Sequence, residues 1–233
     1  MAQAELFKVW ASLLAAVCVA GVLAAAALAG GAEAREAGCT GRVVLDAGHG
    51  GSDSGAVNAR HGLVEEEQTL DVARRLETLL EADGHAVCMT RTGDETLSNN
   101  DRSAYANTTG AEVLVSVHMN GSSDPATDYT TTLFGKWRKD KALAQTVFQS
   151  LSTLPAASGT GTIATRTPYS FASGVLLKSN MPATIAETVF ITNDKEAEWL
   201  LNGRRMPDGS VVSRQAQIAK KLESGIQSYR PTP

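Results

Sequence analysis

Short apolar segments alternate with amphipathic ones from Arg42 onward, and this alternation limits the possible folds more than any other feature. Apolar runs predict strands at 42–45, 86–90, 113–117, 175–177 and 183–186. Apolar residues at helical spacing predict helices at 66–82, 101–107, 139–151, 194–201 and 211–229. Strands joined by helices make right-handed crossovers, which give parallel sheets covered on both sides. We therefore expect a single α/β domain with a mostly parallel, twisted sheet and helices on both faces.

Two of the predicted helices carry well-defined apolar faces. The face of helix 66–82, which Gly84 is placed to end, contains Leu70, Ala73, Leu76, Leu79 and Leu80. The face of helix 211–229 contains Val211, Ile218, Leu222, Ile226 and Tyr229. The Thr- and Gly-rich segment 159–167 predicts a loop, and residues 180–182 predict a turn between the last two strands. We find no internal repeat and no second domain in this pattern.

The N-terminal segment has a different composition. Lys8 precedes an apolar, Ala-rich stretch at 9–30, and small residues then offer cleavage sites after Ala29 or Ala34. This layout is typical of a secretory signal peptide at 1–34. The apolar stretch is also long enough for an uncleaved membrane anchor. The segment predicts export, without stable membrane association if the signal is cleaved.

Two cysteines follow the predicted signal peptide. Cys39 precedes the first predicted strand, and Cys88 lies in the second. If these strands are neighbours, a disulfide is geometrically reasonable, and an oxidising compartment permits it. The alternative is two unpaired, inert thiols, and we favour the disulfide slightly.

The charge pattern excludes some partners without identifying a chemistry. The formal net charge is −4, with 20% charged and 43% hydrophobic residues, as in an ordinary globular protein. No basic run indicates nucleic-acid binding, and no acidic tail indicates disorder.

Four polar residues are expected at the carboxyl ends of the predicted strands, where sheets of this kind place functional groups. His49 follows strand 42–45, His118 ends strand 113–117, and Glu187 ends strand 183–186. Glu65 begins the helix that crosses back from the first strand. Two histidines and a carboxylate are a common ligand set for catalytic zinc, and the remaining carboxylate can act as a general base.

Each of these residues also has a structural explanation. His49 can fill a tight Gly-rich turn, and His118 can bond a backbone group. Glu65, like its two neighbours Glu66 and Glu67, can simply complement the helix dipole, and spacing alone does not select one of the three. Glu187 lies among apolar residues, where a carboxylate is costly unless it is used or paired. Because all four are expected at one sheet edge, we favour the functional interpretation.

Two histidines remain outside this set. His85 begins a predicted strand, and we interpret it as structural or exposed. His61 is close in sequence to Glu65 and can line the same cleft, but we do not assign it as a ligand.

Several motifs resemble one known family. Residues 45–51 (Leu-Asp-Ala-Gly-His-Gly-Gly), followed by Asp-Ser-Gly-Ala at 53–56, closely resemble the opening motif of the AmiC-like family of zinc-dependent N-acetylmuramoyl-L-alanine amidases. Ser-Val-His-Met-Asn at 116–120 resembles its second histidine motif, and residues 182–193 resemble its closing block. Thr90-Arg91 and Asp101-Arg102 resemble the blocks between them. The resemblance extends from Arg42 to Tyr229, and ordered blocks are more specific than one Gly-His-Gly-Gly.

The resemblance implies a site and a reaction. It implies that His49, His118 and Glu65, the glutamate five residues before Leu70, bind Zn²⁺, and that Glu187 is the catalytic base and then acid. The amide of Asn120 is expected to help position the substrate. The implied enzyme is a peptidoglycan hydrolase that cuts between N-acetylmuramic acid and the L-alanine of the stem peptide, in cell-wall remodelling, cell separation or autolysis.

The same resemblance implies the setting in which the protein works. Residues 38–231 are the expected amidase catalytic domain, and peptidoglycan is the expected partner. We expect a monomer that is secreted, periplasmic or located in the cell wall.

Two features bear on how closely the chain follows the family pattern. Val189 occupies a position where family members usually have a small residue. The interval from His118 to Glu187 is short, whereas some relatives carry a helical insertion there that plugs the active site. We interpret helix 139–151 as part of the core and expect activity without a release factor.

Two other functions remain open. A wall-binding or regulatory protein can keep the fold without the chemistry, although such a protein would usually have lost a ligand or the general base. A zinc hydrolase of another bond, a peptide within the stem or an acetyl group, would carry the same four polar residues.

Overall fold

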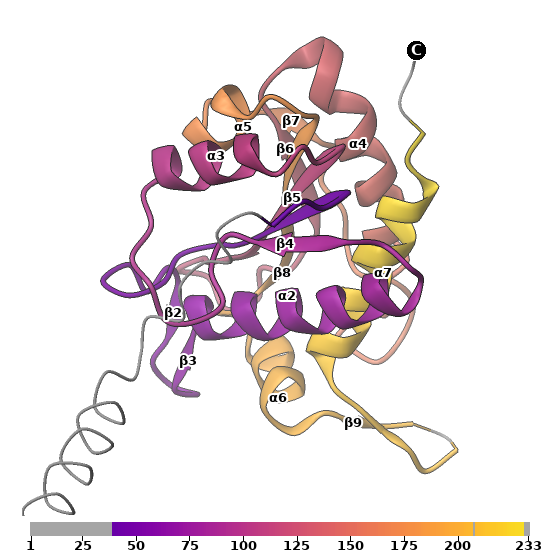
Figure 1. Ribbon diagram of the computed structural model, residues 1–233. Helices are drawn as coiled ribbons and strands as arrows, with labels where there is room; N and C mark the ends of the chain where they lie inside the picture. Colours follow the sequence, from indigo (N-terminus) through magenta and orange to yellow (C-terminus); the bar gives the residue numbers. More distant parts are fainter. Residues whose placement is uncertain (1–38, 207, 231–233) are drawn as a thin grey trace, which may run out of the picture. The chain divides into compact units, whose positions relative to one another are not determined.

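The computed structural model describes residues 39–206 and 208–230, and these form an α/β unit around one six-stranded sheet (Figure 1). The sheet order is β4-β1-β5-β8-β6-β7. Its strands are β1 (Val43–Ala47), β4 (Val87–Met89), β5 (Val113–Asn120), β6 (Thr131–Phe134), β7 (Tyr169–Ser170) and β8 (Ala183–Phe190). Strands β4, β1, β5 and β8 are parallel, whereas β6 pairs with β8 antiparallel. The expected mostly parallel sheet is therefore confirmed, with a reversed edge.

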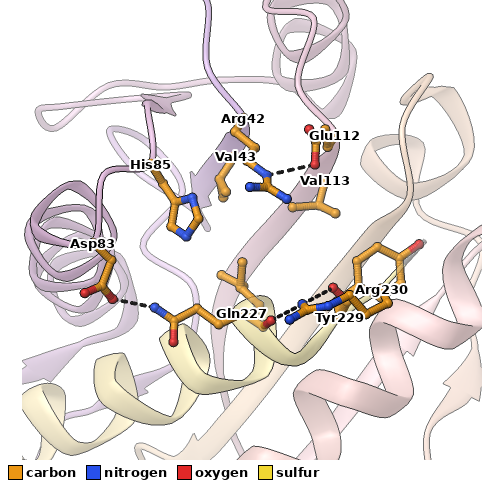
Figure 2. A pocket seen from close by; sticks show the side chains of 10 residues that line it. Arg42, Val43, Asp83, His85, Glu112, Val113, Gln227, Tyr229 and Arg230 are labelled. Atoms are coloured by element: carbon orange, nitrogen blue, oxygen red, sulfur yellow. Dashed lines mark hydrogen bonds and ion pairs between the residues drawn. The ribbon is translucent and has the colours of Figure 1, made fainter.

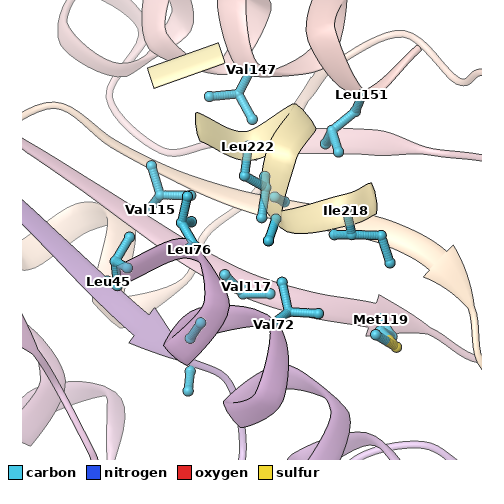
Figure 3. Close-up of a cluster of buried hydrophobic side chains, with 14 of the residues drawn as sticks. Leu45, Val72, Leu76, Val115, Val117, Met119, Val147, Leu151, Ile218 and Leu222 are labelled. Atoms are coloured by element: carbon cyan, nitrogen blue, oxygen red, sulfur yellow. The ribbon is translucent and has the colours of Figure 1, made fainter. Parts of the chain in front are cut away.

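Helices cover both faces of this sheet. The first face is packed by α2 (Glu65–Ala82), α4 (Trp137–Leu151) and α7 (Arg214–Ser228), and its core includes Leu45, Val115, Leu76, Val147 and Leu222 (Figure 3). The opposite face is packed by α3 (Asn99–Thr108) and α5 (Gly174–Lys178). The side chains of Val44 and Leu114 point to this second face because residues alternate along a strand.

Smaller elements complete the unit. Helix α6 (Asp194–Asn202) follows β8 and contacts α7. Two short hairpins, β2 (Val57–Asn58) with β3 (Leu63–Val64) and β9 (Arg204–Arg205) with β10 (Val211–Val212), lie outside the main sheet.

Residues 175–177 were expected to form a strand, and this prediction is wrong. They belong to α5, where Val175 and Leu176 are buried and Leu177 is exposed. Both edges of β8 are already paired, with β5 on one side and β6 on the other. The segment before β8 therefore has no free edge of β8 to pair with, and it packs on α3 instead. The strand that pairs there, β6, was not predicted.

The last helix was expected to begin at Val211, but it begins at Arg214. Ser213 caps it by accepting a hydrogen bond from the backbone N–H of Ala216. Val211 belongs to β10 and is 60% exposed, so it is not part of the apolar face of the helix. The other four predicted helices are confirmed within two residues of their expected ends.

Cys39 and Cys88 form a disulfide, with Cα atoms 6.0 Å apart. The preferred prediction for these cysteines is confirmed, because β4, which carries Cys88, pairs directly with β1. The predicted signal peptide at 1–34 lies outside the described residues. In the described part of the chain, no helix has both the length and the apolar character needed to span a membrane.

A pocket of about 330 Å³ lies where β1 and β5 begin, at the edge of the sheet opposite to His49 and His118 (Figure 2). His85 lines it, beside an exposed ion pair between Arg42 and Glu112. An exposed hydrogen bond from Gln227 to Asp83 joins α7 to the end of α2 there. His85 is half-buried there, and its interpretation as a structural or exposed residue stays a prediction.

Candidate metal centre and active-site cleft

The turn after β1 presents His49 in an unusual backbone conformation. Its φ angle is 60°, and among the residues that the structure describes it is the only non-glycine with positive φ. This left-handed region is disfavoured for residues with a Cβ and persists only where surrounding contacts hold it. The conformation of this turn therefore depends on stabilising contacts from the surrounding residues.

Two buried arginines supply those contacts. Arg102 donates to the carbonyl oxygens of Ala47 and His49, each at 2.7 Å, and Arg91 donates to those of Ala47 and Gly48, each at 2.9 Å. Asp46 orients Arg102 through an ion pair of 2.8 Å. Burial opposes ionisation of Asp46, but Arg102 and two hydroxyl donors outweigh it and lower the pKa of Asp46.

The side chains of His49, Glu65 and His118 meet at one point. His49 Nε2 and His118 Nδ1 lie 3.1 Å apart, and both face Glu65 Oε1, at 3.1 and 3.2 Å. Their ligand atoms all lie within 4.8 Å of one another, so the three residues can hold a metal ion. The three residues that the sequence placed on separate elements are thus brought together as expected.

The outer atoms of this cluster are also held. His49 Nδ1 lies 2.9 Å from a carboxylate oxygen of Asp53, an arrangement that fixes the ring of a metal-binding histidine. Glu65 accepts backbone hydrogen bonds from Ala56 and Met119, both at 2.8 Å. The sequence alone did not select Glu65 from the three neighbouring glutamates. In the structure these hydrogen bonds hold its carboxylate toward the two imidazoles.

Glycines leave the space that this cluster needs. A Cβ on Gly48 would lie 2.4 Å from two ring atoms of His118, and a Cβ on Gly55 would lie 2.6 Å from Glu65 Oε2. Gly55 also has a φ angle of 65°, which favours glycine. Any larger residue at these positions would displace a candidate ligand.

The cluster is electrostatically coupled. Burial lowers the pKa of His49, but the carboxylates of Glu65 and Asp53 outweigh it and raise that pKa to about 9. Burial raises the pKa of Glu65, but the two histidines outweigh it and lower that pKa to about 2. The pKa of His118 is also raised, because Glu65 and Glu187 outweigh its burial. The concentrated negative charge suits a divalent cation.

Glu187 lies beside this cluster on the neighbouring strand. It pairs in register with His118 across β5 and β8. Burial raises its pKa, and no hydrogen bond or ion pair to its carboxylate is found among the described residues. A half-buried carboxylate at a cleft, with a raised pKa and no such partner, is a candidate general base.

A cleft of about 320 Å³ exposes these groups to solvent. Its walls are formed by His49, Asp53, Leu97, Asn99, Arg102, His118, Leu133, Tyr169, Phe171, Ser173, Val175, Ile185 and Glu187. Glu65 lies beneath it, with its side chain 4% exposed. The set can therefore act on a molecule that enters from solvent.

Asn120 and His61 lie outside the cleft lining. Asn120 ends β5, and its Nδ2 atom is buried without a hydrogen-bond partner. The role predicted for Asn120 in positioning substrate stays a prediction. His61 instead faces Asp194, with Nε2 3.2 Å from its carboxylate.

The residues that support the ligands lie in the family-like motifs of the sequence, but their supporting role was not predicted. Arg91, Arg102 and Asp46 are each at most 4% exposed, and Asp53 orients His49 from an exposed position. The available signal was a charged residue within or directly after an apolar strand, as at Asp46 and Arg91. Such a residue needs a buried partner.

Comparisons with known proteins show which family the chain resembles. The profile of the N-acetylmuramoyl-L-alanine amidase family matches residues 43–227. The amidase LytC of Bacillus subtilis is 34% identical over 163 residues, which are 68% of this chain and 31% of LytC. The sporulation-specific amidase of the same organism is 33% identical over 161 residues and is covered to 60%. The chain thus spans less than two thirds of these relatives.

Solved structures agree with the sequence comparisons. An N-acetylmuramoyl-L-alanine amidase from Clostridium difficile 630 superimposes with a TM-score of 0.68 at 29% identity, covering 82% of this chain and 96% of that one. The catalytic domain of the amidase CwlV from Bacillus (Paenibacillus) polymyxa gives a TM-score of 0.67 at 29% identity, covering 80% and 96%. With the family profile matched from β1 to α7, this chain belongs to the N-acetylmuramoyl-L-alanine amidase family.

Proposed function

We propose that this protein hydrolyses the amide bond between N-acetylmuramic acid and the L-alanine of the peptidoglycan stem peptide, with a zinc ion held by His49, Glu65 and His118. The observation that carries this proposal is the convergence of these three side chains beside Glu187, whose carboxylate has no partner among the described residues. Family membership selects the bond, because a His-Glu-His site alone does not identify a substrate.

The residues present fit zinc. Two imidazole nitrogens and one carboxylate oxygen are typical donors for catalytic zinc and leave a position open. Gly48 and Gly55 provide the space, and Asp53 supplies the outer carboxylate that such histidines commonly face. When bound, the ion supplies Lewis-acid chemistry that polarises the scissile carbonyl and makes water nucleophilic near neutral pH.

The remaining chemistry falls to Glu187. Its carboxylate takes the proton of the attacking water and returns it to the nitrogen of the departing L-alanine. The raised pKa of Glu187, which burial causes, favours this cycle because the protonated form is then accessible as a donor. Arg91 and Arg102 take no part in proton transfer but hold the backbone that carries His49.

We further propose that the protein acts outside the cytoplasm as a monomer, that residues 1–34 are a signal peptide, and that residues 38–231 form the catalytic domain. The support is the residue pattern of the N-terminal segment and the cell-wall relatives. Helix α4 packs against α7 and β8 rather than over the cleft, which supports activity without a release factor.

Digestion of purified peptidoglycan tests the function directly. The mature protein should release stem peptides with new L-alanine amino termini, a chelator should stop the release, and zinc should restore it. Mass spectrometry of the products distinguishes the alternatives. New termini within the stem peptide or loss of acetyl groups would show another hydrolase, and no products in any condition would indicate a binding protein.

A further inference from the structure

One wall of the cleft carries exposed aromatic side chains that the proposed chemistry does not use. Tyr169 on β7 is 36% exposed and Phe171 is 48% exposed, and both line the cleft together with Glu187. In the part of the chain that the structure describes, strand β7 is the last strand of the sheet and pairs only with β6. This wall is therefore accessible to a substrate from solvent.

An exposed arginine that is not itself part of the cleft lining lies against Tyr169 of this wall. The guanidinium carbon of Arg166 lies 4.8 Å from the centroid of the Tyr169 ring, and Arg166 Nη1 lies 3.3 Å from the hydroxyl of Tyr129. Tyr129 in turn packs on Phe190 of β8, with ring centroids 4.6 Å apart. The exposed cation is thus oriented by two tyrosines that are anchored to the sheet.

The position of Tyr169 relates this cation to the catalytic carboxylate. Burial raises the pKa of Tyr169, the charge of Arg166 lowers it, and the charge of Glu187 raises it. Tyr169 thus contacts Arg166 with its ring and shares the cleft lining with Glu187. In the described part of the chain no carboxylate forms an ion pair with Arg166, so its remaining N–H donors are available to a ligand.

Peptidoglycan chemistry supplies a matching anion. The L-alanine amine departs at Glu187, and the next residue of the stem peptide is D-glutamate, which is linked through its side-chain carboxyl and leaves its α-carboxylate free. An extended residue spans at most ~3.6 Å, so this carboxylate lies a short distance from the scissile bond. A planar guanidinium held in place is well suited to bind a carboxylate with two hydrogen bonds.

We propose that Arg166, oriented by Tyr129 and Tyr169, binds the free α-carboxylate of the second stem-peptide residue and makes the enzyme prefer substrates in which this group is not amidated. The inference rests on the proposed function and adds a specificity-determining residue to it.

Two synthetic muropeptides that differ only at this group test the inference. One carries D-glutamate and the other D-isoglutamine, and kcat/KM is measured for each with the zinc-loaded protein. The wild-type protein should prefer the acid by about tenfold, as expected for one charge-assisted contact. Arg166→Gln should bring the ratio near one while keeping activity on the amidated substrate, and Arg166→Lys should retain part of the preference.

Arg205→Gln is the matched control, because Arg205 is an exposed arginine in β9, which belongs to a separate hairpin and not to the main sheet that carries Tyr169. It should leave the ratio unchanged. An equal ratio in wild type and Arg166→Gln, or an equal loss on both substrates, would overturn the inference while leaving the amidase function intact. Cleavage of neither substrate by the wild-type protein would instead contradict the proposed function.

Discussion

Thr131 lies directly opposite Glu187 in the β6–β8 pair, and its buried hydroxyl has no hydrogen-bond partner among the described residues. Residues directly opposite in an antiparallel pair point to the same face, with Cβ atoms ~5 Å apart. The next pair on that face, Leu133 and Ile185, lines the cleft. The Thr131 side chain is therefore the cross-strand neighbour of the candidate general base, and a buried donor without a partner calls for an explanation.

This relationship predicts the effect of Thr131→Val. If the hydroxyl orients Glu187 during catalysis, kcat should fall about tenfold with KM unchanged, because about 1.4 kcal/mol of positioning is lost. Thr131→Ser should restore the rate. Muropeptide kinetics with a thermal melt check this.

Thr132→Val serves as its comparison, because that hydroxyl bonds the carbonyl oxygen of Ala144 on the opposite face. It should lower stability and leave kcat unaltered. A Thr131→Val protein with full kcat would show that the hydroxyl does not contribute to catalysis.

Glu187→Gln should bind zinc normally and lose about 10²–10⁴-fold in kcat, because an amide cannot take the proton of water. Zinc binding should persist while hydrolysis is lost, because Glu187 is not one of the three side chains that can hold the metal. Zinc content and hydrolysis are measured on the same preparation. Normal cleavage by this variant would remove Glu187 from the mechanism.

Gly48→Ala should weaken zinc binding by roughly 10–100-fold, the usual effect of disturbing the surroundings of a ligand. The added Cβ would lie 2.4 Å from the ring of His118 and push it away from His49 and Glu65. Competition with a chromogenic chelator measures the affinity. Gly93→Ala, whose Cβ would meet only the end of the Glu95 side chain at 3.8 Å, should bind zinc like the wild type. Equal affinity in both variants would argue against His118 as a ligand.

Stability should fall as pH rises from 6 to 8 because of Glu196. This residue is buried and bonds Arg214, but burial and the nearby carboxyl of Asp128 raise its pKa to about 7. A carboxyl whose pKa is higher in the folded state stabilises the fold when protonated. Its contribution is full below the unfolded pKa of 4.5 and is lost as pH rises through about 7. The expected loss between pH 6 and 8 is about 1.4 kcal/mol.

Urea unfolding at the two pH values, compared with Asp128→Asn, isolates this contribution. The variant removes the neighbouring carboxylate that raises the pKa of Glu196, so its stability should change less over the same interval. Identical pH dependence in the two proteins would refute the assignment.

Opening the disulfide should destabilise the domain by about 2–5 kcal/mol, because the bridge closes a long loop in the unfolded chain. The bridged residues are 49 positions apart. Unfolding is compared for the oxidised protein, the reduced protein and a Cys39→Ser/Cys88→Ala variant. The reductant should not affect the variant, and an equal midpoint for the oxidised and reduced wild type would contradict the prediction.

The sequence by itself determined strands β1, β4, β5 and β8, the five longer helices that lie between or after them, and the identity of the polar residues at the sheet edge. Periodicity located α2 and α7 because a helix buries residues at a fixed spacing, and this property is local. It did not exclude a strand at 175–177, because a short apolar run fits either element until its neighbours are known. The pairing of β5 and β6 with β8 decided that question.

Which residues form the site was likewise decided by the tertiary structure. Residues alone left three glutamates at the start of α2, and only the resemblance singled out Glu65; the folded chain turns Glu65 inward, where Ala56 and Met119 hold it beside His49. Contacts with residues distant in the chain were needed to recognise the roles of Arg91, Arg102 and Thr131. Local sequence encodes which chemical groups are present, but their distances depend on how β1, β5 and β8 pair, and no single segment contains that information.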